Sequence, residues 1–164
     1  MVSGGRFCPA YRLPMINNSM LRFIWAWLVY TWGGLHRYFG NKNNMRGEHE
    51  AAIRYFSRAY AIDPTFYQAR LARAVLLWRE LGRLDEAQAD LDALLVEQPD
   101  YADALLNRAM VAQENGRFHD ARTDLEAYLR LPRADYKAEA SRMLIILNDI
   151  TEEKKEEGGA KKEE

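Results

Sequence analysis

A repeat of about 34 residues is the feature that most limits the folds open to this chain. Three segments share one order of residue types: a glycine, an alanine five positions later, and a large apolar residue four positions after that. These residues are Gly47, Ala52 and Phe56, then Gly82, Ala87 and Leu91, then Gly116, Ala121 and Leu125. A fixed period of this length is typical of stacked helical hairpins, so the sequence predicts an all-α solenoid.

The residue types suit the places that a helical hairpin gives them. Each glycine is expected to follow a helix and to adopt the left-handed conformation that ends it. The alanine is expected where two helices approach closely, because a larger side chain would push them apart. Pro64 and Pro99 close the first two segments, since proline cannot continue a helix and restricts the residue before it.

Together with the residues before each glycine, these segments resemble the tetratricopeptide repeat. That family places bulky, small and aromatic residues along the first helix of each hairpin. The matching positions here are Gly40 and Asn43 in the first repeat, Leu71, Ala74, Val75 and Trp78 in the second, and Leu105, Ala109 and Ala112 in the third. Asn43 stands where the family has an aromatic residue, so the first repeat is degenerate. The resemblance implies repeats over 36–66, 67–100 and 101–132, in a short α-solenoid of antiparallel hairpins.

The chain after the repeats divides into two parts. Residues 134–149 have the apolar pattern of one more helix, with Ala138, Met143, Leu144 and Leu147 facing the array. Terminal helices of this kind cap a solenoid by shielding its last apolar face. Residues 150–164 are charged and of low complexity, and we expect them to be disordered.

The chain before the repeats begins with residues 1–19, a lead-in rich in glycine and proline that we expect to be flexible. Residues 20–39 then form a hydrophobic, aromatic segment in which thirteen uncharged residues separate Arg22 from His36. Tryptophan and tyrosine favour the boundary between membrane and water. We therefore expect membrane contact through Phe23, Trp25, Trp27, Tyr30 and Trp32.

Residues 20–39 leave several arrangements open. A span usually takes about 20 apolar residues, so this segment is a marginal membrane span or a helix lying at the membrane surface. It could instead pack on the repeats or on a partner protein. Transit peptides also carry arginine and lack acidic residues, so a soluble repeat protein with a targeting presequence is a further alternative.

Charge divides the chain at the same place. Residues 1–47 contain six basic residues and no acidic one, while residues 48–164 contain 17 basic and 24 acidic residues. Anionic lipid attracts the basic part, whereas an acidic body repels nucleic acid. Arg37, Lys42 and Arg46 follow the apolar run, and this bias places the repeats on the cytoplasmic side of a membrane.

Catalytic, cofactor and metal sites are not expected. The three histidines, His36, His49 and His119, have no metal-ligand spacing, and Cys8 lacks an activating partner in sequence. Gly33–Gly34 is an isolated pair in an apolar run and not a phosphate loop. The acidic residues alternate with arginine on helix surfaces, where solvated pairing is the ordinary arrangement.

The resemblance implies a different kind of site, because first helices in this family line a concave groove that holds a peptide or a partner helix. The positions carried over from the family are Arg37, Asn41, Ala72, Arg73, Leu76, Arg79, Asp103, Leu106, Asn107, Met110 and Gln113. Their apolar and basic groups suit a partner segment with hydrophobic and acidic residues. Some relatives clamp a C-terminal carboxylate, but Arg73, Asp103 and Asn107 depart from that pattern, and we do not expect a clamp.

These patterns lead to a functional expectation. We expect a non-catalytic protein-interaction module, with protein partners and membrane lipid but without nucleic acid or a small-molecule substrate. The favoured role is a membrane-attached adaptor, assembly factor or accessory subunit of a membrane complex. The alternative is a structural subunit of a large complex, with the aromatic helix packed on protein.

Overall fold

The computed structural model describes residues 18–132 and 134–160, with the backbone alone for 153–160. Seven α-helices and no strand make up this part of the chain. The helices are α1 (Asn18–Asn43), α2 (Arg46–Ile62), α3 (Tyr67–Leu81), α4 (Leu84–Glu97), α5 (Ala102–Glu114), α6 (Phe118–Arg130) and α7 (Lys137–Ala160). The predicted all-α fold is confirmed.

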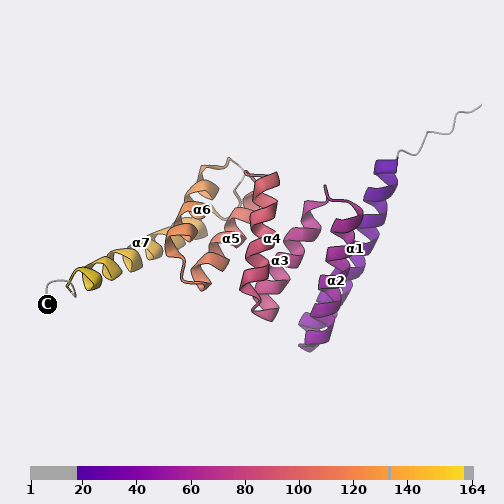
Figure 1. The fold of residues 1–164 in the computed structure, drawn as a ribbon, viewed down its shortest axis with the longest axis horizontal. Helices are drawn as coiled ribbons and strands as arrows, with labels where there is room; N and C mark the ends of the chain where they lie inside the picture. The colour runs from indigo at the N-terminus through magenta and orange to yellow at the C-terminus, as the bar shows by residue number, and fades with distance from the viewer. Residues whose placement is uncertain (1–17, 133, 161–164) are drawn as a thin grey trace, which may run out of the picture.

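The helices form three hairpins that stack in a row. The hairpins are α1 with α2, α3 with α4, and α5 with α6, and each helix also contacts the next one along the chain. The array is elongated, with α1 at one end and α7 projecting from the other (Figure 1). The two recurrent positions, occupied by Ala52, Ala87 and Ala121 and by Phe56, Leu91 and Leu125, are buried throughout. The sequence period therefore marks the helix contacts, as predicted.

Helix α1 is the first helix of the first hairpin, and not a separate segment before the repeats. Its buried residues, Ala26, Gly33 and Gly40, recur every seven positions and so share one face. Ala26 packs in a cluster with Ala59, and Gly40 lies against the ring of His49. The boundary expected between residues 20–39 and the repeats is therefore absent, because one continuous helix serves both.

The first turn differs from the other two. Gly82 and Gly116 adopt the left-handed conformation, with φ of 64° and 71°, as predicted. The prediction for Gly47 is wrong, since this residue lies inside α2. The left-handed residue of that turn is Asn44, with φ of 50°. Asparagine tolerates this conformation better than most residues, so α2 can begin earlier than the glycine pattern indicated.

An ion pair ties the two helices of each later hairpin together. In the second hairpin, Arg73 of α3 donates two hydrogen bonds to Asp90 of α4. In the third, Nε and Nη2 of Arg108 lie 2.8 and 2.7 Å from the two carboxylate oxygens of Asp124. Both aspartates are buried, and a buried carboxylate needs such a partner.

Helix α7 covers the end of the array and is longer than the expected 134–149. Ala140 and Leu147 are fully buried, and α7 contacts α6. The helix continues to Ala160, into the segment expected to be disordered. The lead-in, apart from its last two residues, and residues 161–164 lie outside the described residues.

Candidate functional site

A groove lies on the side of the array formed by α3, α5 and α7. It encloses about 330 Å³. Its lining residues are Arg79 from α3, Leu106, Asn107 and Met110 from α5, Tyr136 before α7, and Glu139 and Met143 from α7. We call this set the α5 groove. Helices α3, α5 and α7 thus contribute to one surface, as expected where the first helices of successive hairpins stand side by side.

The α5 groove combines an apolar floor with opposite charges at its edges. Leu106 is buried, and Met110 and Met143 are half-buried. Methionine is flexible and polarizable, so it adapts to different apolar side chains. Arg79 is exposed and lies 5.2 Å from the ring centroid of Trp78, while Glu139 is exposed on α7 and pairs with Arg142 at 3.1 Å. This arrangement suits an extended segment with an apolar side chain and a charged neighbour.

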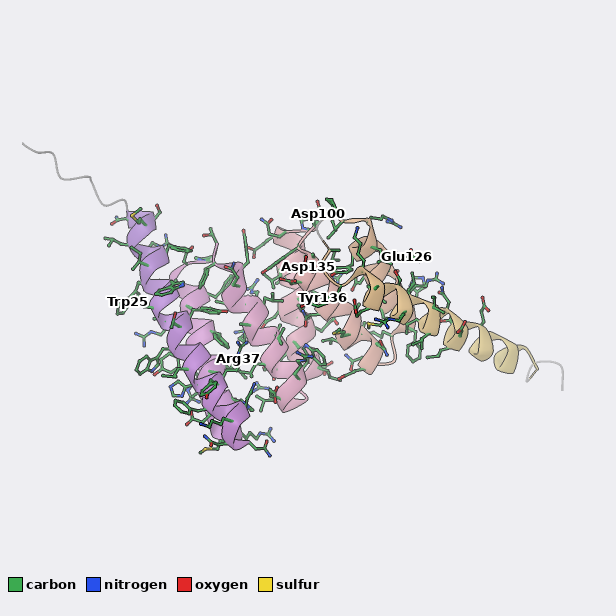
Figure 2. All side chains as sticks on the ribbon, turned by 180° about the vertical axis from the view of Figure 1, so that it is seen from behind. Trp25, Arg37, Asp100, Glu126, Asp135 and Tyr136 are labelled. Atoms are coloured by element: carbon green, nitrogen blue, oxygen red, sulfur yellow. The ribbon has the colours of Figure 1, made fainter. Side chains whose placement is uncertain are left out.

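The last turn of chain before α7 is fixed by a buried tyrosine. The backbone N–H of Tyr136 donates a 2.9 Å hydrogen bond to the hydroxyl of Tyr128. Tyr128 is 1% exposed in the core of the third hairpin. Tyr136 itself is exposed at the start of α7 and is labelled in Figure 2. The buried hydroxyl thus positions one wall of the α5 groove.

Only part of the predicted groove residues come together. Arg79, Leu106, Asn107 and Met110 line the α5 groove. Ala72 and Leu76, by contrast, are buried in a cluster with Ala52 and Phe56 of the first hairpin. They stabilise the stacking of two hairpins and are covered by it.

The other predicted groove residues have different surroundings. Arg73 donates hydrogen bonds to Asp90 and to Ser57, whose hydroxyl oxygen lies 2.8 Å from Nη1. The side chain of Asn41 accepts a 2.8 Å hydrogen bond from Nε2 of His49. Arg37 is half-buried on α1, on the opposite side from Trp25 (Figure 2). Asp103 is exposed and Gln113 half-buried on α5, and neither lines the α5 groove.

Sequence reasoning missed the contribution of α7 to the groove, which consists of Tyr136, Glu139 and Met143. The available signal was the apolar pattern of residues 134–149. Treating that helix as the first helix of a fourth, incomplete hairpin would have placed Met143 beside the α5 positions. The predicted role of a cap accounts for the buried face of this helix but not for its groove residues.

A second candidate surface is the side of α1 that faces away from α2. Large apolar residues cover it from residue 20 to residue 39, each between 42% and 60% exposed. They are Met20, Leu21, Ile24, Trp25, Trp27, Leu28, Trp32, Leu35, Tyr38 and Phe39. We call this set the outer face of α1. Figure 2 shows Trp25 pointing away from the other helices.

Among the five residues expected to contact a membrane, two have aromatic partners in the array. The half-exposed ring of Phe23 lies 5.5 Å, between centroids, from that of Phe66 in an edge-on contact. Tyr30 is turned inward. Its ring lies 5.3 Å from that of Phe56 and 5.1 Å from that of Phe66, between centroids. It therefore belongs to the interior of the first hairpin. In the described residues, no helix has both the length and the apolar character needed to cross a membrane, so the expected membrane span is unsupported.

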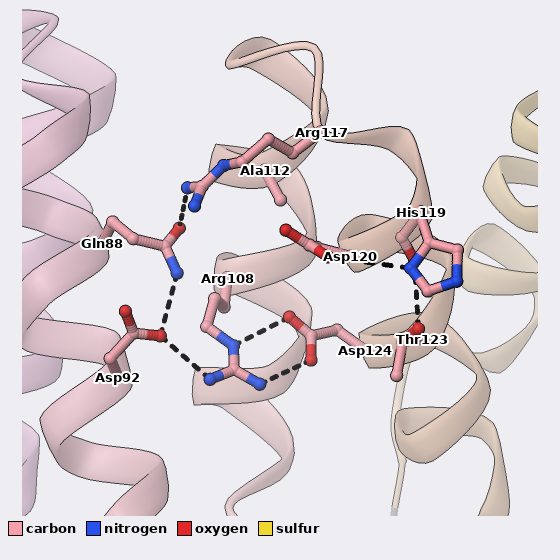
Figure 3. Close-up of a pocket in the computed structure, with 9 residues that line it drawn as sticks. All are labelled: Gln88, Asp92, Arg108, Ala112, Arg117, His119, Asp120, Thr123 and Asp124. Atoms are coloured by element: carbon pink, nitrogen blue, oxygen red, sulfur yellow. Dashed lines mark hydrogen bonds and ion pairs between the residues drawn. The ribbon is translucent and has the colours of Figure 1, made fainter.

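A second cavity, of about 430 Å³, lies among α4, α5 and α6 (Figure 3). Its polar groups satisfy one another: Arg108 bridges Asp124 and Asp92, and Gln88 bonds to Asp92 and to Arg117. The hydrogen bonds from Arg108 to Asp124 raise the pKa of the guanidinium further. Because each charge already has a partner, this network stabilises the third hairpin and leaves little capacity for a ligand. The described residues include no group of three or more side chains suited to hold a metal ion.

Comparison with known proteins agrees with this architecture. A family model described as tetratricopeptide repeat matches residues 46–102 and 79–137. A tetratricopeptide repeat and J domain-containing co-chaperone, DNJ1, from Cryptococcus neoformans is 30% identical over 112 residues. The match takes in 68% of this chain but only 21% of the co-chaperone, so the chain spans about a fifth of that relative.

Solved structures share the fold at low identity. The first TPR domain of human RPAP3 is 20% identical, with a TM-score of 0.64, over 80% of this chain and 95% of that domain. The Yersinia enterocolitica type III secretion chaperone SycD, solved with a peptide of the translocator YopD, is 15% identical. Its TM-score is 0.63, over 76% of this chain and 92% of the chaperone.

Proposed function

This chain belongs to the tetratricopeptide repeat family, and from that premise we propose that it is a non-catalytic adaptor attached to a membrane. The α5 groove holds an extended segment of a partner protein. The first hairpin attaches the protein to the membrane. The adaptor thereby keeps its partner close to the membrane.

The observation that carries this proposal is the α5 groove. It is an open, part-apolar channel on the side of the array where three helices align. Its two methionines accept an apolar side chain, and Arg79 attracts an acidic one. A structure of the same fold, that of SycD, was solved with a peptide from another protein.

The chemistry of the groove describes the expected segment. An apolar residue of the partner packs between Met110 and Met143. An acidic residue next to it lies near Arg79, and an amide group of the partner shares Glu139 with Arg142. Nδ2 of Asn107 donates a hydrogen bond to the backbone carbonyl of Asp103. Its Oδ1 can accept a hydrogen bond from a backbone N–H of the partner.

A point substitution tests this function better than a truncation. A fragment of residues 40–150 would lose most of α1, whose Ala26 and Gly33 pack on α2. Met110→Glu instead places a charge in the groove of the full chain. Val96→Glu is the matched control, since Val96 is an 82% exposed apolar residue of α4 outside the groove.

Both variants and the wild type are used for affinity purification in mild detergent, followed by mass spectrometry. We expect a partner that is enriched with the wild type and with Val96→Glu and is lost with Met110→Glu. Circular dichroism shows whether all three proteins are folded. Equal recovery of every protein with Met110→Glu would contradict a role for the groove.

A second candidate is a structural subunit of a large complex, in which the outer face of α1 packs on protein. The observation that favours it is the same apolar surface, since such patches also form protein interfaces. Flotation with protein-free lipid vesicles separates the two functions. A helix that binds lipid floats with the vesicles, whereas a helix that docks only on protein does not.

A further inference from the structure

We propose that the outer face of α1 binds an anionic lipid surface, with the helix lying in the plane of that surface. This inference rests on the membrane attachment proposed above and specifies its chemistry and orientation. It follows from the distribution of apolar groups, the charges of the first hairpin and the packing of α1 on α2.

The apolar surface is long and rich in tryptophan. From Met20 to Phe39 the helix rises about 30 Å, and large apolar side chains face outward along all of it. Trp25, Trp27 and Trp32 are each about half exposed. Exposed apolar patches of this extent mark interaction sites. Tryptophan is enriched at membrane–water interfaces, where its ring is buried among apolar groups and its N–H reaches water.

The first hairpin presents positive charge beside this surface. Helix α1 contains no acidic residue. The acidic side chains of α2 and of its C-cap are already paired or buried. Oε2 of Glu48 lies 2.7 Å from Nδ1 of His36, Glu50 pairs with Arg83, and Asp63 is buried. The exposed basic residues of the hairpin are Arg22, Lys42, Arg46, Arg54 and Arg58. Nζ of Lys42 lies 5.9 Å from the ring centroid of Tyr38 on the outer face. Positive charge in the hairpin that carries an apolar face fits anionic headgroups above acyl chains.

The same charges oppose a second copy of this chain as the occupant. In an antiparallel pair of α1 helices, the end that carries Lys42 and Arg46 would lie beside the end that carries Arg22, whose Nε also bonds to the Ile62 carbonyl of α2. In a parallel pair, each basic residue would face its own copy. No carboxylate of α1 is present to compensate either arrangement, and like charges across an interface reduce binding.

The packing of α1 determines its orientation. The inner face lies on α2 from Ala26, beside Ala59, to Gly40, beside His49. Arg54 and Arg58 of α2 are exposed, so a bilayer that enclosed α1 would also enclose these charges. With the helix parallel to the surface, the outer face enters the headgroup region while α2 and the groove remain in water.

The test uses the full chain and vesicles of phosphatidylcholine with or without phosphatidylglycerol. We expect flotation with the anionic vesicles and at least about tenfold weaker binding to neutral ones, because anionic headgroups attract the basic residues near the surface. Added salt should weaken the binding. Lys42→Gln with Arg46→Gln should also weaken it at least tenfold, whereas Arg130→Gln with Lys137→Gln, at the other end of the array, should not.

Two further measurements test the face and its orientation. Leu28→Glu should abolish vesicle binding, while Val96→Glu should leave it unchanged. In variants that keep a single tryptophan, lipids brominated at one depth should quench Trp25 and Trp32 equally, and Trp78 much less. Unequal quenching of Trp25 and Trp32 would overturn the in-plane orientation.

Other outcomes overturn the proposal as a whole. One is that the protein does not bind anionic vesicles, and another is that it binds neutral and anionic vesicles equally. A third is that sedimentation equilibrium shows a dimer that Leu28→Glu dissociates. Failure of the proposed function is distinguishable, because Met110→Glu should lose the partner but keep vesicle binding. If cellular membranes retain the protein but lipid vesicles do not, the adaptor is attached through protein and this inference is wrong.

Discussion

Gly33 of α1 lies directly against the aromatic ring of Phe56 of α2. A Cβ atom at position 33 would come within 2.8 Å of two ring carbons and 3.1 Å of the Cβ of Tyr55. Phe56 is 1% exposed, so its ring has little room to move. The aromatic helix at the start of the chain is therefore built into the repeat array by a contact that only glycine permits.

Gly33→Ala tests this contact, and the neighbouring glycine supplies the control. Alanine in a helix is favoured over glycine by about 1 kcal/mol, but overpacking costs about 1–3 kcal/mol. We expect Gly33→Ala to lower the free energy of unfolding by about 1 kcal/mol in urea denaturation. Gly34 has no atom within 4 Å of its Cβ position, so Gly34→Ala should raise it by about 0.5–1 kcal/mol. Stabilisation by both substitutions would mean that α1 does not pack on α2 in this way.

The two kinds of repeat glycine should respond in opposite directions to alanine. Gly82 has φ of 64°, where a Cβ atom costs about 1–2 kcal/mol, so Gly82→Ala should be destabilising by about 1 kcal/mol. Gly47 is the second residue of α2 with open space around it, so Gly47→Ala should stabilise by up to about 0.5 kcal/mol, less than in the middle of a helix. Thermal unfolding gives the sign of each change. A loss of stability with Gly47→Ala would restore the sequence-based assignment of a turn at that position.

The ion pair of the third hairpin should contribute measurably to stability. Asp124 is 5% exposed, and its removal leaves Arg108 with Asp92 as a partner at 2.9 Å. We expect Asp124→Ala to cost about 2 kcal/mol, less than the full loss of a buried pair because that second partner remains. Asp120→Ala is the control, since its side chain is 60% exposed and its loss should change stability by less than about 0.5 kcal/mol. Equal effects in chemical denaturation would contradict the assigned pairing.

Helix α7 should be part of the cooperative fold. Leu147 is 1% exposed, so Leu147→Ala should cost about 2–4 kcal/mol through lost apolar contacts and a residual cavity. Ile145 is 60% exposed, and Ile145→Ala should have an effect below about 0.5 kcal/mol. If Leu147→Ala is equally mild, α7 is attached only loosely, and the α5 groove lacks one of its walls.

The helical period was predictable from the sequence because its residues are also the packing residues. Ala52, Ala87 and Ala121 are buried at the contacts between helices, and a contact of that kind tolerates few residue types. The prediction for Gly47 was wrong because a glycine can also occupy the first turn of a helix, as Gly47 does in α2. Asn44, which makes the turn, carries no comparable periodic signal.

The candidate groove was less predictable, for a geometric reason. Positions carried over from a family pattern depend on the rotation of each helix about its axis. Ala72 and Leu76 are turned toward the first hairpin, while Leu106 and Met110 line the α5 groove. The pairing of Arg73 with Asp90 joins residues 17 positions apart, and no local pattern indicated it.

Site-specific photocrosslinking at position 110 tests the central claim most directly. A photoreactive residue replaces Met110 in the groove, or Val96 outside it, in the full chain within its native cells. The proposed adaptor predicts one prominent protein crosslinked from position 110 through a short extended segment, and absent from position 96. A synthetic peptide of that segment should compete for the crosslink. The same products from both positions, or products from position 96 alone, would contradict a binding role for the groove.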